Sequence, residues 1–167
     1  MTNVHSSYSE ALKATLIVVG KYRQTGREVQ MRAYAGKGLL SLMAQARVSG
    51  VGIIPISGFR TTGYQESLFQ KAVAKYGSED AACRWVARPG YSEHHTGLAI
   101  DLGDDANPDC DVESSFETTG AFHWLQQHAQ QFGFELSFPR NNTWGINYEP
   151  WHWRFIGTPE AKFIFQS

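Results

Sequence analysis

Two short segments hold most of the polar residues that could do chemistry. Residues 92–101 have the sequence SEHHTGLAID, and residues 149–154 have the sequence EPWHWR. If the chain around Asp101 is a strand, Gly97 and Ala99 share its face, because side chains alternate along a strand. The Asp101 carboxylate would then project from a surface kept open by small residues. Such a surface suits a group that must approach closely, such as a metal ion.

The histidines of both segments can supplement this carboxylate. His94 precedes the predicted strand, where a turn can fold it back toward Asp101. Glu149 and His152 are three residues apart, and Pro150 between them resists both a central strand and a helix interior. The chain should therefore turn there and bring both side chains to one side. Two histidines and one carboxylate as ligands, with a second carboxylate as base, are typical of a catalytic zinc site that keeps one position for water.

Each segment also has an interpretation in which its residues neither bind a metal nor take part in catalysis. The residues alone do not exclude it. In the first, Asp101 is exposed at a strand end and His94 lies in a surface loop. In the second, residues 151–155 form an aromatic core strand and Glu149 is solvated.

Arg60 follows a predicted buried strand at a strand-to-loop junction, where functional side chains are often presented. It is a candidate cation for an oxyanion, or else a surface arginine in a salt bridge.

The elements that must position these residues are predicted from periodicity and from turn residues. Early helices followed by scattered strands, without βαβ regularity, favour an α+β fold with helices packed on an antiparallel sheet. Five helices are predicted. The first begins at the capping pattern Ser7-x-x-Glu10 and carries Leu12, Leu16 and Val19 on one face. The others cover residues 39–46 (ending before Gly50), the segment from the capping pattern Thr62-x-x-Gln65 to Gly77, residues 78–87, and residues 122–132 (ending before Gly133). The predicted strands cover 51–56, 97–102, 134–138 and 146–155, and residues 104–115 are a predicted loop.

Length and composition narrow the class of protein. The 167 residues suit a single domain over 1–167, and a low charged content of 19% with 13% aromatic residues excludes intrinsic disorder. A net charge of -1 with no basic run argues against nucleic acid as a partner. No apolar stretch is long enough for a transmembrane segment. The early apolar run over 16–19 is too short for a signal-peptide core, so no export signal is visible.

The two cysteines bear on metal binding and on compartment. Cys83 and Cys110 form no CxxC pair, which excludes structural zinc held by thiolates. A disulfide between them would imply an oxidising compartment, whereas two buried thiols would not. We favour the disulfide over the free thiols.

The combined motifs resemble those of the VanY-type D-alanyl-D-alanine carboxypeptidases, zinc peptidases with the hedgehog/DD-peptidase fold. The family pattern S-x-H-x-x-G-x-A-x-D is matched from Ser92 to Asp101, and E-x-x-H is matched from Glu149 to His152. The preceding S-G-[FY]-R element is present at 57–60. The resemblance covers about residues 44–157.

The resemblance implies a role for each matching residue. The implied ligands of one zinc ion per chain are His94, Asp101 and His152. Glu149 matches the catalytic base, which later protonates the leaving amine, and Arg60 matches the cation that stabilises the substrate carbonyl. The implied substrate-binding residues are Gln65, Ser92 and Trp151. For Trp151, a place in the aromatic core is an almost equally good interpretation. His95 matches no ligand position and should lie beside the site or face solvent.

The implied activity is hydrolysis of the terminal D-alanine from peptidoglycan stem peptides by a monomeric enzyme. Two alternatives keep the zinc chemistry but change the bond: an L,D-carboxypeptidase and a peptidoglycan endopeptidase. A third, from another class, is a non-catalytic zinc-containing peptide-binding domain, which would need neither Glu149 nor Arg60. Because mature peptidoglycan lies outside the cytoplasmic membrane, we expect an extracytoplasmic location, with a cytoplasmic one as the alternative.

Overall fold

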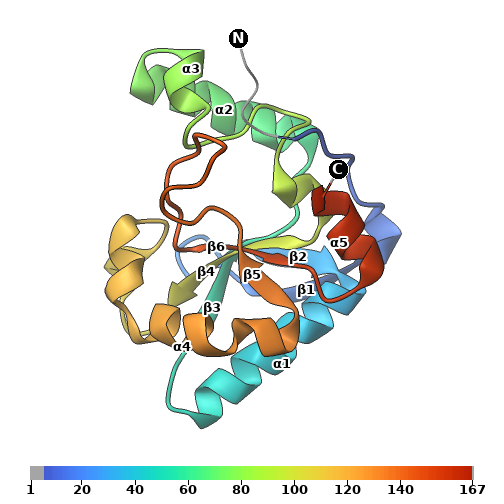
Figure 1. Cartoon of the computed structure of the whole chain (residues 1–167), viewed down its shortest axis with the longest axis vertical. Helices are drawn as coiled ribbons and strands as arrows, with labels where there is room; N and C mark the ends of the chain where they lie inside the picture. Colours follow the sequence, from blue (N-terminus) through green and yellow to red (C-terminus); the bar gives the residue numbers. More distant parts are fainter. Residues whose placement is uncertain (1–5, 167) are drawn as a thin grey trace.

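The computed structural model describes residues 6–166, so residues 1–5 and 167 of the predicted domain lie outside the described part (Figure 1). The strands are β1 (Leu16–Lys21), β2 (Glu28–Arg32), β3 (Ile53–Ser57), β4 (Ala99–Asp104), β5 (Phe134–Leu136) and β6 (His152–Phe155). The α-helices are α1 (Ala33–Val48), α2 (Thr62–Tyr76), α3 (Glu79–Ala82), α4 (Gly120–His128) and α5 (Pro159–Gln166). The 3₁₀ turns are η1 (Lys13–Thr15), η2 (Glu93–Thr96), η3 (Pro108–Cys110), η4 (Ser114–Thr118) and η5 (Ala129–Phe132).

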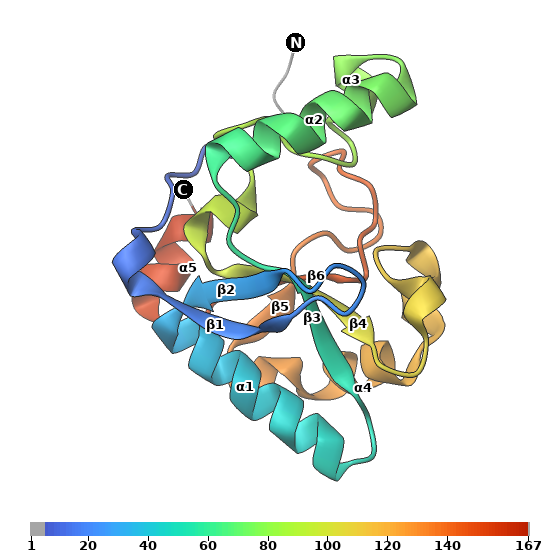
Figure 2. The same ribbon diagram turned by 180° about the vertical axis from the view of Figure 1, so that it is seen from behind.

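The strands form two antiparallel sheets, which confirms the predicted α+β class. One sheet has four strands in the order β3-β4-β6-β5, and the other is the β1–β2 hairpin. Figure 2 shows this hairpin lying beside β3. Strand β4 is central, with β3 and β6 as its neighbours, and is buried along its whole length.

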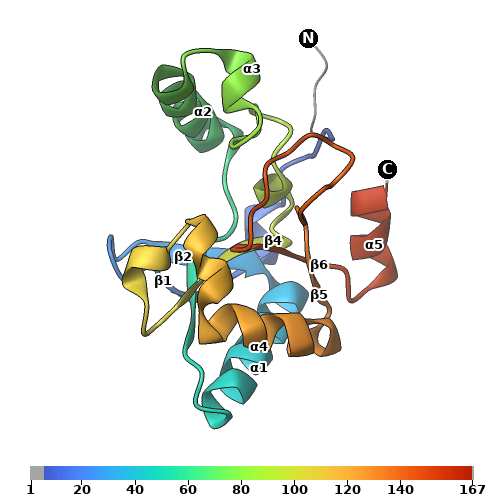
Figure 3. The ribbon, with the colours of Figure 1, turned by 60° about the vertical axis from the view of Figure 1, so that its left-hand side comes forward.

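Apolar side chains of the four-stranded sheet pack against α1 and α4, which lie together on one side of it (Figure 3). Helices α2 and α3 lie on the opposite side, away from this core (Figures 1 and 3). Burying a side chain of leucine size contributes about 1.5–3 kcal/mol, so this core holds the sheet firmly. Its most deeply buried members include Met31, Leu39, Leu42, Leu98, Ile100, Leu102, Phe116, Leu125 and Phe134.

Helix α2 has clear local determinants at both ends. The Thr61 hydroxyl accepts a hydrogen bond from the Tyr64 backbone N–H at 3.1 Å, so Thr61 is the N-cap and not Thr62 as predicted. The helix ends at Gly77, whose φ of 83° is the left-handed conformation that glycine adopts without strain. At the N-terminal end the Glu10 carboxylate accepts hydrogen bonds from the backbone N–H and hydroxyl of Thr62, which fastens the N-terminal segment to α2.

The predicted first helix is wrong. The β-branched run Ile17-Val18-Val19 lies in strand β1, where it pairs with β2, with Ile17 opposite Met31. Branched side chains suit a pleated surface that packs on one face, and this packing outweighs the local capping pattern.

Smaller differences concern the lengths of elements. Helix α3 is shorter than the predicted helix over 78–87, and β6 is shorter than the predicted strand over 146–155. The structure also contains β2 and α5, which periodicity did not predict. None of the helices within residues 6–166 combines the length and apolarity required to cross a membrane.

The predicted disulfide is wrong as well. The Cys83 thiol packs with Phe69 and Ala72 in a small apolar cluster under α2, and Cys110 lies in η3 on another part of the fold. No disulfide joins them, so the cysteines carry no information about the compartment.

Candidate metal centre

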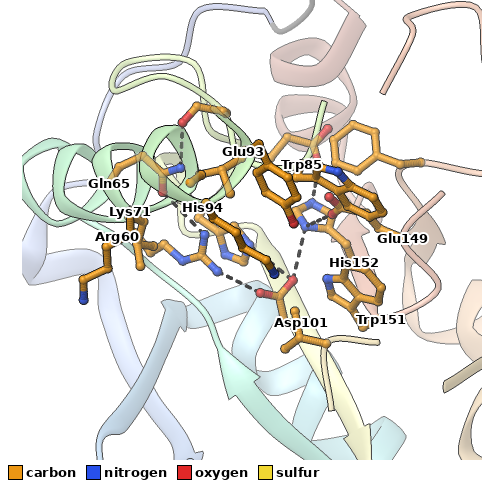
Figure 4. Close-up of a pocket in the computed structure, with 18 residues that line it drawn as sticks. Arg60, Gln65, Lys71, Trp85, Glu93, His94, Asp101, Glu149, Trp151 and His152 are labelled. Carbon is orange, nitrogen blue, oxygen red and sulfur yellow. Dashed lines mark hydrogen bonds and ion pairs between the residues drawn. The ribbon is translucent and has the colours of Figure 1, made fainter. Parts of the chain in front are cut away.

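Three buried side chains converge at the end of the sheet next to α2 (Figure 4). Asp101 lies on β4, directly opposite His152 on β6, and His94 lies in η2, which leads into β4. The Asp101 Oδ1 atom is 3.3 Å from His94 Nε2 and 3.2 Å from His152 Nδ1. The structure thus brings together the three residues for which the sequence predicts metal binding.

Hydrogen bonds on the far side of each imidazole fix which nitrogen faces Asp101. His94 Nδ1 lies 2.7 Å from the Gly58 carbonyl oxygen, which can only accept, so Nδ1 carries the hydrogen. His152 Nε2 lies 2.8 Å from the Glu93 carboxylate and donates to it in the same way. In the neutral rings, His94 Nε2 and His152 Nδ1 therefore present lone pairs to the same point.

The geometry and chemistry of this donor set fit zinc. Ligand atoms about 2.0–2.1 Å from a tetrahedral zinc ion lie about 3.3 Å from one another, close to the two distances measured from Asp101 Oδ1. This oxygen is buried and accepts no hydrogen bond, although buried polar atoms are nearly always satisfied. A cation bound between the two imidazoles would satisfy it.

Gly58 helps to hold His94 because it has no side chain. A Cβ atom at this position would lie 2.2 Å from the Gln30 carbonyl oxygen on β2. The missing side chain allows the link after β3 to approach β2, where the Phe59 N–H donates to the same carbonyl at 2.7 Å. The Gly58 carbonyl is thereby placed against the His94 ring.

Arg60 contacts the centre through Asp101. Its Nη2 donates to Asp101 Oδ2 at 2.8 Å, its Nε to the Ser57 hydroxyl at 3.0 Å and its Nη1 to the Gln65 side-chain oxygen at 3.4 Å. Because Oδ2 is engaged by the guanidinium, Asp101 offers only Oδ1 to a metal ion. The salt bridge that the alternative interpretation placed at the surface is therefore largely buried beside the site.

Glu149 lies at the rim of the centre, with a carboxylate oxygen 3.6 Å from His152 Nδ1. Residues 146–151 turn into β6 as the proline predicted, and both side chains reach the same side. Burial, together with the negative charges of Asp101 and Glu93, raises the pKa of Glu149 to about 8 despite the opposing charge of His152. A carboxyl group with a pKa near neutrality can both accept and release a proton.

The pKa values of the other members reflect their contacts. Burial and the positive charge of Arg60 lower the pKa of His94 to about 4. Burial also disfavours charge on His152, but the hydrogen bond to Glu93 and the negative charges of Glu93 and Asp101 raise its pKa to about 10. Burial alone would raise the pKa of Asp101, yet the two histidines and Arg60 hold it well below its usual range.

A cavity of about 320 Å³ opens from the centre toward α2. The side chains of Gln65 and Trp151, both predicted to contact substrate, line this cavity. Ser92 does not: its hydroxyl accepts a hydrogen bond from the His94 N–H and caps η2, so its predicted contact with substrate stays a prediction. The far wall is formed by α2 and the segment after α3, with Leu68, Lys71, Ala72, Lys75, Tyr76, Trp85 and Val86.

Sequence reasoning missed Glu93 and left the position of His95 open. Glu93 is 5% exposed and contacts His152, and the signal for it was a charged residue directly before a candidate ligand. His95 is fully buried and does not face solvent. Its Nδ1 donates to the Arg60 carbonyl oxygen at 2.8 Å, and its Nε2 accepts the Gly90 N–H at 3.0 Å.

The chain is similar to known carboxypeptidases. Residues 28–158 match the family model of the VanY D-alanyl-D-alanine carboxypeptidases. A D-alanyl-D-alanine carboxypeptidase of Enterococcus faecalis is 35% identical over 141 residues, which are 77% of this chain and 49% of that protein. The chain spans about half the length of this relative and of a Bacillus subtilis relative.

Two solved structures are similar over nearly the whole chain. The LdcB LD-carboxypeptidase superposes with a TM-score of 0.77 at 29% identity and covers 95% of this chain and 74% of its own. A vancomycin-resistance D,D-pentapeptidase, VanY, in complex with Zn(II) superposes with a TM-score of 0.70 at 27% identity and covers 99% of this chain and 94% of its own. On the strength of the matched family model and these likenesses, the chain belongs to the VanY D-alanyl-D-alanine carboxypeptidase family.

Proposed function

We propose that this chain is a zinc-dependent carboxypeptidase that removes the terminal D-alanine from peptidoglycan stem peptides. The observation that carries the proposal is the convergence of His94, Asp101 and His152 around one unsatisfied oxygen, with Glu149 beside them. Among residues 6–166 this is the one group of side chains arranged to hold a metal, which supports one zinc ion per chain. Membership of the family and the Zn(II) complex of a similar protein support the choice of metal.

The reaction assigns a task to each residue around the cavity. Zinc held by the three ligands would supply a Lewis acid that lowers the pKa of water and polarises a carbonyl group. Glu149 takes a proton from the attacking water and delivers it to the amine nitrogen as the peptide C–N bond breaks. Arg60 stabilises the negative charge that develops on the carbonyl oxygen. Gln65 and Trp151 border the space available to the terminal residue.

A digest of defined stem peptides tests metal, reaction and bond together. Pentapeptide ending in D-Ala-D-Ala and tetrapeptide ending in a single D-alanine are incubated with the enzyme, and the products are identified by mass. We expect loss of one D-alanine from the pentapeptide, abolition by a chelator and recovery with Zn²⁺. Intact pentapeptide in the presence of Zn²⁺ would contradict the proposal.

An L,D-carboxypeptidase is the second candidate. It is supported by the likeness to LdcB, whose superposition is better than that of the D,D-pentapeptidase. The same digest separates the two, because an L,D-enzyme shortens the tetrapeptide and spares the D-Ala-D-Ala bond. Either substrate lies outside the cytoplasmic membrane once incorporated in the wall, so we propose an extracytoplasmic site of action for a monomeric enzyme.

A further inference from the structure

Glu93 is a carboxylate buried where a charge is costly. Its side chain is 4% exposed, and an unpaired carboxylate at this depth would be neutralised or would destabilise the fold. The Arg154 guanidinium and the His152 imidazole each contact its carboxylate at 2.8 Å, and these partners compensate for its burial. A carboxylate buried at this depth should have a role that a neutral side chain could not fill.

The contacts of Glu93 divide between its two oxygens. Oε1 accepts from Arg154 Nη1 at 2.8 Å. Oε2 accepts from His152 Nε2 at 2.8 Å and from the Ser137 hydroxyl at 2.6 Å. Arg154 is held in turn by Glu135, whose Oε1 accepts from Nε at 2.7 Å. Both carboxylate oxygens are therefore held by hydrogen bonds, and the carboxylate cannot rotate its Oε2 atom away from the imidazole.

The position of Glu93 in the chain makes it a link between two parts of the centre. It precedes His94 in η2, whereas His152, Arg154 and Ser137 belong to β6 and the residue after β5. The Glu93 carboxylate thus joins the 3₁₀ turn that carries one predicted ligand to the strand that carries another. Figure 4 shows Glu93 on the side of His152 away from Asp101.

We propose that Glu93 is a positioning residue for the metal centre, which holds His152 in the tautomer and orientation that direct Nδ1 toward the ion. Arg154 and Ser137 already donate to the two carboxylate oxygens, so the oxygen that meets the imidazole accepts from Nε2 and leaves Nδ1 as the ligand atom. Such a partner also raises the basicity of the ligating nitrogen, and its loss typically weakens metal binding about 10- to 100-fold. The inference rests on the proposed zinc function, and its test reads out metal binding rather than turnover.

The test compares Glu93→Gln with two matched controls on the full chain. Ser137→Ala removes a hydrogen bond to the same oxygen without touching the imidazole, and Glu135→Gln removes the other partner of Arg154. Zinc affinity is measured by competition with a chromophoric chelator, and thermal unfolding is measured on the metal-free proteins. We expect Glu93→Gln to lose about 10- to 100-fold in zinc affinity and both controls to stay within about threefold of the wild type.

The outcomes separate this inference from the proposed function. A folded Glu93→Gln protein that binds zinc as tightly as the wild type would overturn the positioning role and leave the carboxypeptidase standing. A loss of unfolding temperature with unchanged zinc affinity would assign Glu93 to stability alone. A wild type that binds no zinc would overturn both proposals.

A measurement on the wild type decides the case if the variant does not fold. In protein loaded with ¹¹³Cd, nitrogen NMR should show metal coupling at His152 Nδ1 and a hydrogen on Nε2 that is protected from exchange. Coupling at Nε2 would overturn the proposal, because Glu93 could not then accept a hydrogen bond from that atom.

Discussion

Glu149 and His152 are three residues apart, yet the proposed function assigns them separate tasks, and substitutions should separate metal binding from catalysis. In Glu149→Gln the metal ligands are untouched while the group that moves the proton is lost. We expect full zinc stoichiometry by metal analysis and a fall in kcat of about 10²- to 10⁴-fold in the pentapeptide digest. Normal turnover by this variant would show that another group is the base.

His152→Ala should remove both metal and activity, because it deletes one of three ligands and leaves the Glu93 carboxylate without its imidazole. Dialysed protein should retain substoichiometric zinc by metal analysis. The matched control is His123→Ala, an exposed histidine on α4, which should bind zinc and turn over like the wild type. Equal zinc content in the two variants would remove His152 from the ligand set.

At the scale of elements, the contact between Glu10 and the start of α2 makes a prediction about pH. The hydrogen bonds from Thr62 lower the pKa of Glu10 from its ordinary value of 4.5. A carboxyl whose pKa is depressed on folding stabilises the protein above its unfolded pKa, and this contribution is lost as the pH falls through the folded pKa.

The free energy of unfolding should therefore be higher in the wild type than in Glu10→Gln near pH 7, and the difference should shrink below about pH 4.5. Urea denaturation across this range measures it. Glu66→Gln, on the exposed face of α2, serves as the control. A difference that does not vary with pH would mean that the charge of Glu10 contributes nothing.

The elements also show what a single sequence can and cannot predict. Helix α2 and the strand around Asp101 were predictable, because Gly77 and the alternation of small and apolar residues are local signals. Strand β1 was not, since Leu16 and Val19 fit a helical face as well as a strand, and only pairing with β2 decides between them. The predicted disulfide was wrong for the same reason, because the distance between the two cysteines depends on the whole fold.

The predicted metal ligands converged because their chemistry and spacing constrain them independently of the exact fold. Glu93 was missed because its importance lies in contacts with β6 and the residue after β5, which are distant in the chain. The same applies to His95, whose two hydrogen bonds reach backbone atoms of separate segments. Ligand residues are thus easier to find from a sequence than the residues that hold them.

For the whole molecule, zinc should couple distant parts of the chain and stabilise the fold. An ion that binds only the native state adds about 4 kcal/mol at a free concentration of 1,000 times its Kd. For a chain of this size that corresponds to a rise in Tm of about 8–16 °C. Differential scanning calorimetry of chelated and zinc-loaded protein measures the shift, and His152→Ala should not show it. An equal Tm with and without zinc would contradict binding at this centre.

If Arg60 stabilises the substrate carbonyl as proposed, its three hydrogen bonds have a consequence for substrate selection. Its guanidinium is anchored by Ser57, Gln65 and Asp101 before any peptide arrives, so the entropy of ordering this long side chain is lost during folding and not during association. A cation fixed in this way cannot follow an oxygen that arrives elsewhere. Discrimination between neighbouring peptide bonds then depends on whether the carbonyl group reaches a stationary charge, and a misaligned bond forfeits that stabilisation entirely.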